Sequence, residues 1–351
     1  MKGTLRTPSW CRLGIEGMGS REMHTSMDMT QNTTGLGNGF SATLVCPKDR
    51  GPLYKREDSL ECGSCGSVFP LVRGVPILIN DENSVFAVAD YVETPGYEGA
   101  SYARDWDRVG GGRRLVRKIF KNFAEAPSSL RHLSDMEAIE IVRGDCPQPR
   151  ILVVGSGGRG HGGAEDRITA MDVAFGPGVE IIADAHDLPF PDGAFDLVIA
   201  IAVLEHVASP PRCVEEFWRV LQPNGYVYAI TPFLQPVHMG AYDFTRFTPL
   251  GHRRLFRRFD AIEAGPALGV GTVAAWILCS FLESIPAGRY GRNLGRALGL
   301  LVTPGLRKLD RWLSGPSYMD AAGGVFFWGR RREEPIPDRL ILKEYRGGFA
   351  R

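Results

Sequence analysis

The segment spanning residues 150–233 carries the pattern that most constrains the fold of this chain. An apolar run, ILVV, leads directly into GSGGRGHGG, and DAHDLPFPDGAFDLVIA and RVLQPNGYVYAITPF follow at the spacing of further strands and loops. A buried parallel strand that ends in glycines lets main-chain N–H groups approach a polar ligand. Asp172 and Asp184 follow later strands and can accept hydrogen bonds from hydroxyl and amino groups of such a ligand. We therefore predict a nucleotide-type site at one edge of a parallel sheet.

Alternating strand-like and helix-like segments predict the α/β class for the main domain. The expected strands cover residues 150–154, 168–173, 180–183, 195–200 and 225–231. A helix is expected over residues 211–221, ending at a Pro-Asn-Gly stop signal, and GHRRLFRRF is also typical of a helix. FDAIEAG and GGVFFWGRR indicate two further strands. This alternation favours a parallel sheet that helices cover on both faces.

Changes in composition divide the chain into successive parts. The first part lacks apolar periodicity and cannot bury enough surface to offset its ordering entropy, so it is expected to be a disordered tail. Short β-like runs then indicate a small ribbon, and a polar stretch indicates a helical linker or lid. The expected parts are the tail at 1–41, the ribbon at 42–82, the linker at 83–147, the main domain at 148–334 with a helical insertion at about 266–318, and a solvated tail at 335–351.

The formal net charge of the chain is +1, so no global field draws it to nucleic acid or to an anionic membrane. The seven cysteines are scattered and no secretory signal is recognised, which favours a reducing, cytoplasmic setting. The uncharged run 264–282 contains Pro266, Gly269 and Gly271 near its start. A buried helix is therefore expected there instead of a membrane span, with peripheral membrane contact as the alternative.

Three motifs, LPFPDGAFDLV, AVLEHV and RVLQPNGYV, occur in this order and closely resemble the type 11 branch of the class I S-adenosylmethionine-dependent methyltransferases. The resemblance covers residues 150–233 and continues more loosely toward the C-terminus. It implies a Rossmann-like, doubly wound, mostly parallel seven-stranded sheet whose last strand is antiparallel. It also implies S-adenosyl-L-methionine as the cofactor. NAD(P)-dependent oxidoreductases share the glycine turn but have no place for LPFPDGAFDLV.

The resemblance also implies which residues contact the cofactor. Gly155, Ser156, Gly157 and Gly158 would lie against its methionine part, Asp172 would accept from the ribose hydroxyls, Asp184 and Ala185 would meet the adenine, and Ile201 would border the sulfonium. The family usually has an acidic residue where Val153 stands. The amino-acid end of the cofactor is therefore expected to be held differently, by Arg159, His161 or the preceding segment.

The N-terminal stretches CPKDRGPL, ECGSCGSVFP and VRGVPIL resemble a small zinc-ribbon segment known as a methyltransferase activator and fused to some methyltransferases. A structural zinc needs four ligands, and paired turns supply them two at a time. The resemblance implies Cys46, Asp49, Cys62 and Cys65 as ligands, with Asp49 in the place of a fourth cysteine. A metal-free ribbon is the alternative.

The segment TPFLQPVHMGAYDFTRFT follows the fifth expected strand, where ligand-facing loops of such sheets lie. His238 is the candidate base for an acceptor hydroxyl, because histidine titrates near working pH; a hydrogen bond within the loop is its alternative role. Tyr242, Asp243 and Arg246 are candidates for binding the acceptor, with an ordinary Asp243–Arg246 ion pair that pins the loop as the alternative. His206 in LEHV is expected to position or pack beside the cofactor.

These features favour an S-adenosylmethionine-dependent methyltransferase that O-methylates a small molecule or sugar. A tRNA or protein acceptor reached through the ribbon stays open, although no basic patch interleaved with aromatic residues points to nucleic acid. The other class of function is a non-catalytic module that binds the cofactor or a protein.

Overall fold

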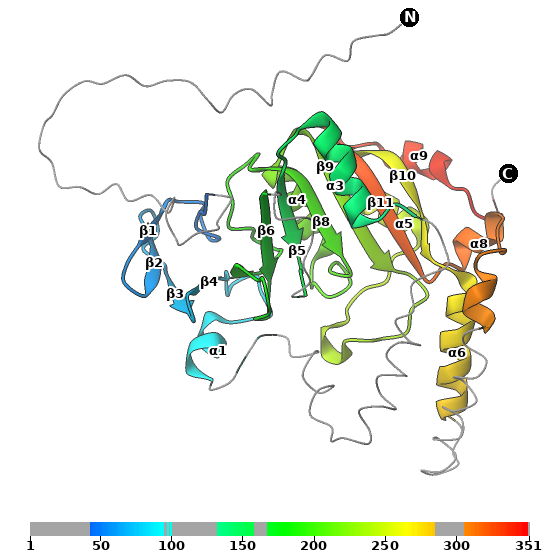
Figure 1. The fold of residues 1–351 in the computed structure, drawn as a ribbon, viewed down its shortest axis with the longest axis horizontal. Helices are drawn as coiled ribbons and strands as arrows, with labels where there is room; N and C mark the ends of the chain where they lie inside the picture. Colours follow the sequence, from blue (N-terminus) through cyan, green and yellow to red (C-terminus); the bar gives the residue numbers. More distant parts are fainter. Residues whose placement is uncertain are drawn as a thin grey trace, which may run out of the picture.

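The computed structural model describes residues 43–94, 97, 99, 132–157, 167–284 and 305–349. In this part of the chain a single mixed sheet runs through the molecule, and helices lie on both of its faces (Figure 1). The eleven strands follow the order β1-β2-β3-β4-β7-β6-β5-β8-β9-β11-β10. The predicted N-terminal tail and residues 100–131 of the predicted linker lie outside the described residues.

Five parallel strands form the middle of the sheet. In spatial order they are β7 (Ile181–Ala183), β6 (Arg167–Asp172), β5 (Arg150–Val154), β8 (Phe195–Ile201) and β9 (Leu221–Pro232). The apolar side chains of β5 and β8 are buried on both faces, as is usual for parallel sheets. The observed bounds agree closely with the expected ones except in β9. That strand begins four residues earlier and runs through the predicted stop signal, where Asn224 has a φ of 65°.

Two further strands complete the predicted seven. β11 (Gly324–Arg331) lies between β9 and β10 (Phe259–Leu268) and is antiparallel to both. The order β7-β6-β5-β8-β9-β11-β10, with one antiparallel strand, confirms the predicted Rossmann-like architecture.

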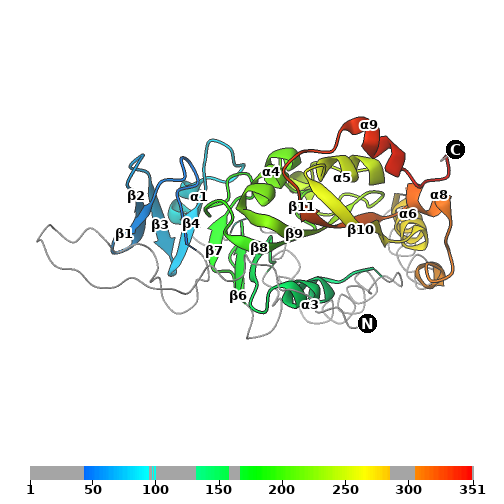
Figure 2. The ribbon, with the colours of Figure 1, turned by 90° about the horizontal axis from the view of Figure 1, so that it is seen from above.

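Helices lie on opposite faces of the sheet (Figure 2), and alternate side chains of the central strands belong to two different buried clusters. The described helices are α1 (Val88–Glu93), α3 (Asp135–Asp145), α4 (Pro210–Val220), α5 (Pro249–Leu255), α6 (Val270–Ser284), α8 (Pro316–Asp320) and α9 (Asp338–Ile341), with short 3-10 turns η2 (Gly240–Tyr242) and η3 (Leu342–Glu344). Ile151 and Val153 of β5 share a buried cluster with α3, whereas Leu152 and Val154 share one with α4. The two-residue period of the strand thus produces a sheet covered on both sides.

The N-terminal ribbon is part of the same sheet. Its strands are β1 (Leu53–Lys55), β2 (Ser59–Cys62), β3 (Val68–Val72) and β4 (Val75–Leu78), each antiparallel to the next. β4 then pairs with β7 in parallel, with Ile77 opposite Ile182 and Leu78 opposite Ala183. All four of these side chains are buried. The ribbon therefore extends the main sheet directly.

The described part of the predicted insertion contains α6 and α8. Asp310 is buried and caps the N-terminus of α6. Its carboxylate accepts hydrogen bonds from the backbone N–H groups of Gly271 at 2.6 Å and Thr272 at 3.0 Å. A Cβ atom at Gly269 would lie 2.2 Å from Cγ of Asp310, so glycine allows this close approach. Among the described helices, none combines the length and apolar character needed to span a bilayer.

The region predicted as a C-terminal tail contributes α9 and η3, which pack beside α5. Ile341 is buried there, and Arg253 Nε pairs with Glu344 Oε2 at 2.5 Å. His252, the neighbour of Arg253, lies in an aromatic cluster with Phe256 and Phe327 at ring-centroid distances of 5.0 and 6.4 Å. Burial lowers the pKa of His252 to about 3, and its Nε2 has no hydrogen-bond partner. The folded protein therefore keeps this imidazole neutral.

We predict that His252 makes the fold sensitive to acid. Its pKa is about 3 in the folded protein against 6.5 as the ordinary value, so its contribution to stability is complete above pH 6.5 and falls as the pH drops toward 3. His252→Phe should reduce the slope of the unfolding free energy against pH below 6.5, by up to about 1.4 kcal/mol per pH unit. Urea unfolding at several pH values measures this slope, and equal slopes in parent and variant would contradict the prediction.

Candidate functional site

The turn after β5 has a backbone shape that favours glycine. Gly155 and Gly157 have φ values of 65° and 60°. A Cβ atom at Gly155 would lie 2.5 Å from Cγ2 of Val203, so the turn packs closely against the segment that follows β8. Gly158, the last predicted member of this loop, lies outside the described residues.

Asp172 ends β6 and contacts the glycine turn directly. Its Oδ2 accepts the N–H of Gly157 at 2.8 Å, and its Oδ1 accepts the N–H of Ala174 at 3.0 Å. Burial raises the pKa of Asp172 above its ordinary value, while these N–H groups oppose the shift. The hydroxyl of Ser156, the residue before Gly157, is buried and has no hydrogen-bond partner among the described residues. The turn therefore retains polar capacity that a ligand could satisfy.

Asp184 follows β7 and joins the main domain to the N-terminal segment. Its Oδ2 accepts the hydroxyl of Ser84 at 2.5 Å, and its Oδ1 lies 3.0 Å from the backbone nitrogen and 2.5 Å from Nδ1 of His186. Burial acts to raise the pKa of Asp184, but the hydrogen bonds from His186 and Ser84 lower it. Ala185 is buried beside it. Asp184 is thus held as an oriented carboxylate.

The predicted cofactor residues that the structure describes share one edge of the sheet. Gly155 directly follows β5, and Ile201 is the last residue of β8, which pairs with β5. Asp172 and Asp184 lie at the ends of the neighbouring strands β6 and β7. This is the carboxyl edge of the parallel strands, where ligands bind in open α/β sheets. Arg159 and His161, expected to compensate for the apolar Val153, lie outside the described residues.

Glu205, His206 and His238 form a cluster in the loops that follow β8 and β9. The Nε2 atoms of the two histidines are 3.1 Å apart. Oε1 of Glu205 lies 3.5 Å from Nε2 of His206 and 3.8 Å from Nε2 of His238. Nδ1 of His206 lies 2.8 Å from the carbonyl oxygen of Tyr242. Nδ1 of His238 lies 3.3 Å from Oδ2 of Asp243. The loops after two neighbouring strands thus bring these side chains together.

Burial changes the protonation equilibria of this cluster. It raises the pKa of Glu205 to about 8 and lowers the pKa of His206 and of His238. Both carboxylate oxygens of Glu205 are buried, and neither has a hydrogen-bond partner in the part of the chain that the structure describes. Sequence reasoning singled out both histidines but missed Glu205. The available signal was an acidic residue within the otherwise apolar start of AVLEHV.

Arg246 holds the loop after β9 in shape. Its guanidinium donates to both carboxylate oxygens of Asp243 and to the carbonyl oxygens of Gln235, Pro236 and Thr245. These bonds use all five of its N–H donors. Burial acts to raise the pKa of Asp243, but the hydrogen bonds from Arg246 bring it down to about 2. The geometry supports the ion pair that pins the loop.

Tyr242 connects this loop to the N-terminal segment. Its ring stacks on that of Phe86, with centroids 5.5 Å apart and an interplanar angle of 12°. Its carbonyl oxygen lies beside His206, as described above. Residues that precede the main domain therefore help to position the loop that carries His238.

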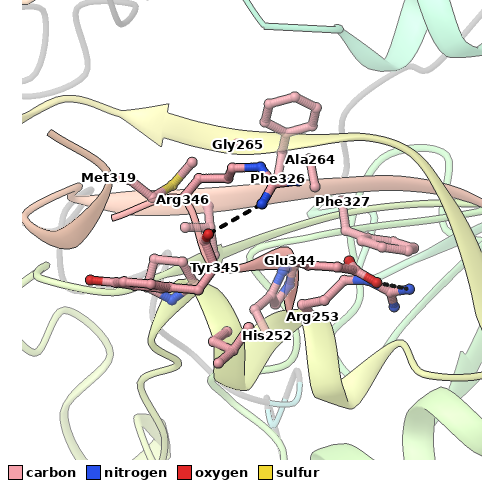
Figure 3. A pocket seen from close by; sticks show the side chains of 13 residues that line it. His252, Arg253, Ala264, Gly265, Met319, Phe326, Phe327, Glu344, Tyr345 and Arg346 are labelled. Carbon is pink, nitrogen blue, oxygen red and sulfur yellow. Dashed lines mark hydrogen bonds and ion pairs between the residues drawn. The ribbon is translucent and has the colours of Figure 1, made fainter. Parts of the chain in front are cut away.

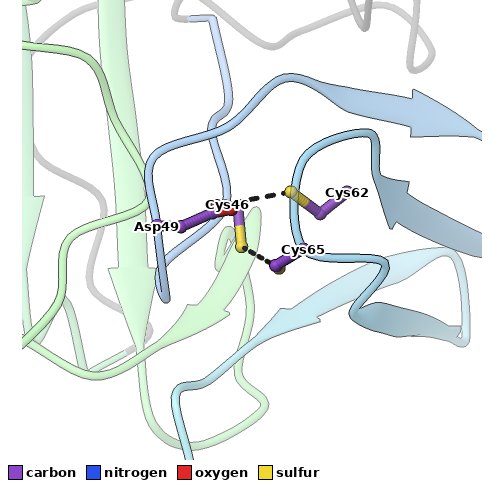
Figure 4. Close-up of side chains that lie close together, drawn as sticks. All are labelled: Cys46, Asp49, Cys62 and Cys65. Carbon is purple, nitrogen blue, oxygen red and sulfur yellow. Dashed lines mark hydrogen bonds between the residues drawn. The ribbon is translucent and has the colours of Figure 1, made fainter.

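Cys46, Asp49, Cys62 and Cys65 lie together in two turns of the ribbon (Figure 4). One ligand atom from each lies within 4.8 Å of the others, and the described cysteines are free thiols. The Sγ atoms of Cys46 and Cys65 are 3.7 Å apart, and Cys62 Sγ lies 3.3 Å from Asp49 Oδ1. Backbone N–H groups two residues further on point at the sulfurs of Cys46 and Cys62, each at 3.4 Å. This donor set fits a structural zinc.

A small cavity of about 100 Å³ lies elsewhere, among α5, β10, β11 and the C-terminal residues (Figure 3). The Arg253–Glu344 pair and the rings of Phe326 and Phe327 line it. None of the residues predicted for the cofactor, acceptor or metal lines this cavity. It therefore adds no support to the predicted site.

Two family models match the chain. Residues 165–229 match a model described as a methyltransferase domain, and residues 40–74 match one described as a Trm112p-like protein. The first match contains β6, β7, β8 and most of β9, and the second contains the ribbon turns with their four candidate ligands.

Curated relatives match over short stretches. The chain is 38% identical over 73 residues to the demethylmenaquinone methyltransferase of Symbiobacterium thermophilum, covering 20% of this chain and 29% of that protein. It is 37% identical over 71 residues to a ubiquinone/menaquinone biosynthesis C-methyltransferase of Hydrogenovibrio crunogenus, covering 20% and 28%. A mitochondrial arginine-hydroxylase of Rattus norvegicus is 45% identical over 49 residues, 14% of each chain. The matches span less than a third of the length of these relatives.

Among solved structures, the complex of the Haloferax volcanii Trm112 methyltransferase activator with a methyltransferase is 16% identical, covering 56% of this chain and 89% of that one, with a TM-score of 0.32. A methyltransferase of Thermotoga maritima is 14% identical, covering 63% and 97%, with a TM-score of 0.35. The chain thus contains a segment, residues 165–229, that matches a methyltransferase domain, and it is preceded by a Trm112p-like segment at residues 40–74.

Proposed function

We propose that this chain transfers a methyl group from S-adenosylmethionine to a hydroxyl group of a small molecule or sugar. One observation carries the proposal: the glycine turn, Asp172, Asp184 and Ile201 lie along the carboxyl edge of a methyltransferase-type sheet. The cluster around His238 lies in loops at the ends of β8 and β9, which neighbour the turn. In this proposal the cofactor binds beside the glycine turn, and the methyl acceptor binds beside the cluster around His238.

The residues present fit the adenosyl part of the cofactor. Asp172 is anchored by N–H groups of its own chain and keeps lone pairs for ribose hydroxyls. Asp184 is an oriented carboxylate for an amino group, and Ser156 offers a buried, unpartnered hydroxyl. When bound, S-adenosylmethionine supplies a methyl group on a positively charged sulfur.

Methyl transfer is a displacement that depends on alignment, so the main task of the chain is to hold the acceptor in line with the methyl group. An acceptor hydroxyl must also lose its proton, and His238 is the proposed base. Its side chain is 31% exposed, and its loop is fixed by the Asp243–Arg246 pair. Tyr242 is the remaining proposed contact for the acceptor.

A carbon acceptor is the second candidate, because two of the similar proteins are named for C-methylation or for methylation of demethylmenaquinone. Product analysis separates the two, since a methyl ether and a methyl group on carbon give distinct NMR signals. The ribbon keeps a protein or tRNA acceptor as a further alternative, which labelled methyl transfer into each class of macromolecule would detect.

Asp172→Ala should weaken binding of S-adenosylmethionine and S-adenosylhomocysteine by about 10- to 100-fold, because charge-assisted hydrogen bonds to the ribose are lost. Calorimetric titration measures both affinities. Asp260→Ala, which changes an exposed aspartate on β10, is the matched control and should bind like the parent. Absence of binding of either ligand by the parent would overturn the proposed activity.

His238→Ala should lower turnover by about 10²–10⁴ once an acceptor is identified, because an acid–base group is removed. The acceptor is sought by transfer of labelled methyl groups into small-molecule extracts. His132→Ala, a histidine beside Phe326 and outside the cluster, is the control. Equal turnover in parent and His238→Ala would remove His238 from the mechanism.

Zinc should be held by the ribbon, so the parent should contain about one more zinc per chain than Cys62→Ser, which removes one of four ligands. Asp49→Cys should keep the metal, because it preserves four donors. Mass spectrometric metal analysis of protein prepared without chelators gives the counts. The same zinc content in parent and Cys62→Ser would show that the ribbon is metal-free.

A further inference from the structure

We propose that Glu205, His206 and His238 bind a divalent transition-metal ion at the carboxyl edge of the sheet, as a site distinct from the ribbon. One ligand atom from each residue lies within 4.8 Å of the others. The site would be built by the loop after β8, which carries Glu205 and His206, and by the loop after β9, which carries His238.

The acceptors beside Nδ1 of the two histidines indicate which nitrogen faces the cluster. Nδ1 of His206 lies 2.8 Å from a carbonyl oxygen, which can only accept, so Nδ1 carries the hydrogen. Nδ1 of His238 is at ion-pair distance, 3.3 Å, from Oδ2 of Asp243, and the negative charge of this carboxylate favours a hydrogen on Nδ1. In the neutral imidazoles, both Nε2 atoms therefore present lone pairs to each other across 3.1 Å. Two facing acceptors are satisfied by a cation placed between them.

Glu205 adds a carboxylate to these two lone pairs. Its side chain is 1% exposed, and among the described residues neither of its oxygens has a hydrogen-bond partner. Arg246, the nearby cation, directs its donors to Asp243 and to three carbonyl groups of the loop. A buried carboxylate without a partner is costly unless a cation or a proton compensates it. Two imidazole nitrogens and one carboxylate form a donor set suited to a transition-metal ion.

The surroundings of the histidines match those of metal ligands in proteins. Ligating histidines usually donate their other ring N–H to a backbone carbonyl or a carboxylate, which fixes the ring orientation. His206 has the first kind of partner in Tyr242, and Nδ1 of His238 lies 3.3 Å from a carboxylate oxygen of Asp243. The Asp243–Arg246 pair in turn fixes the loop. The orientation of both rings is therefore determined by contacts outside the proposed site.

Three protein ligands leave coordination positions open, as in catalytic metal sites. The chemistry that fits those positions is an oxygen donor, so the ligand class is a small molecule bearing hydroxyl or carboxylate oxygens. This part of the inference rests on the proposed function, because it identifies the bound molecule with the methyl acceptor. It would make His238 a metal ligand in place of a base.

The test counts bound ions on the full chain by equilibrium dialysis against Mn²⁺ or Co²⁺, followed by metal analysis. Mn²⁺ prefers oxygen and nitrogen donors to thiolates, so it discriminates against the cysteines of the ribbon. The parent should bind one divalent ion per chain more than Glu205→Gln or His238→Ala. Glu205→Gln keeps the shape of the side chain and removes the charged ligand. Binding of Mn²⁺ should also raise the unfolding temperature of the parent, but not that of Glu205→Gln or His238→Ala.

Glu180→Gln is the matched control, because Glu180 is another glutamate whose Oε2 is buried without a partner, and it lies outside the cluster. This variant should retain the additional ion. Equal ion counts in the parent, Glu205→Gln and His238→Ala would overturn the inference. The assay contains neither cofactor nor acceptor, so its failure is separate from failure of the methyl-transfer proposal, which the cofactor titration tests.

Discussion

The parallel pairing of β4 with β7 is the contact on which the arrangement of this molecule depends. β7 has only three residues, and without β4 its backbone groups would form an open edge of the sheet. The pairing satisfies that edge and buries Ile77 and Leu78. It also places Ser84 within hydrogen-bond distance of Asp184. The segment that directly follows the ribbon thereby supplies a residue that orients a proposed cofactor contact.

The carboxyl edge combines rigid supports with groups whose bonding capacity is unused. Asp172 and Arg246 are engaged by their own chain through several hydrogen bonds. By contrast, Ser156 and Glu205 are buried with polar atoms that have no partner within the described part of the chain. Because unpartnered buried polar atoms are costly, positions of this kind mark where a ligand would compensate them. Asp172 ends β6 and Ser156 lies just beyond β5, whereas Glu205 and Arg246 lie in the loops after β8 and β9.

The sequence predicted the strands well because their apolar runs are bounded by glycine, proline and acidic residues. Asp172, Asp184 and His238 were singled out for the same reason, since they lie at or beyond strand ends, and their roles stay predictions. Glu205 was missed because its importance arises from burial without a partner, which spacing along the chain does not reveal. The β4–β7 pair was missed because it joins segments about a hundred residues apart, and local patterns carry no information on such pairing.

The ribbon and the methyltransferase domain belong to one polypeptide, and this has a kinetic consequence. When two binding modules are tethered, their encounter becomes intramolecular, so it no longer depends on the concentration of the protein. Association of β4 with β7 is therefore a first-order process that dilution does not reverse. A separately encoded ribbon would need continued coexpression to remain in place, whereas here the stoichiometry of one ribbon per domain is set by translation itself.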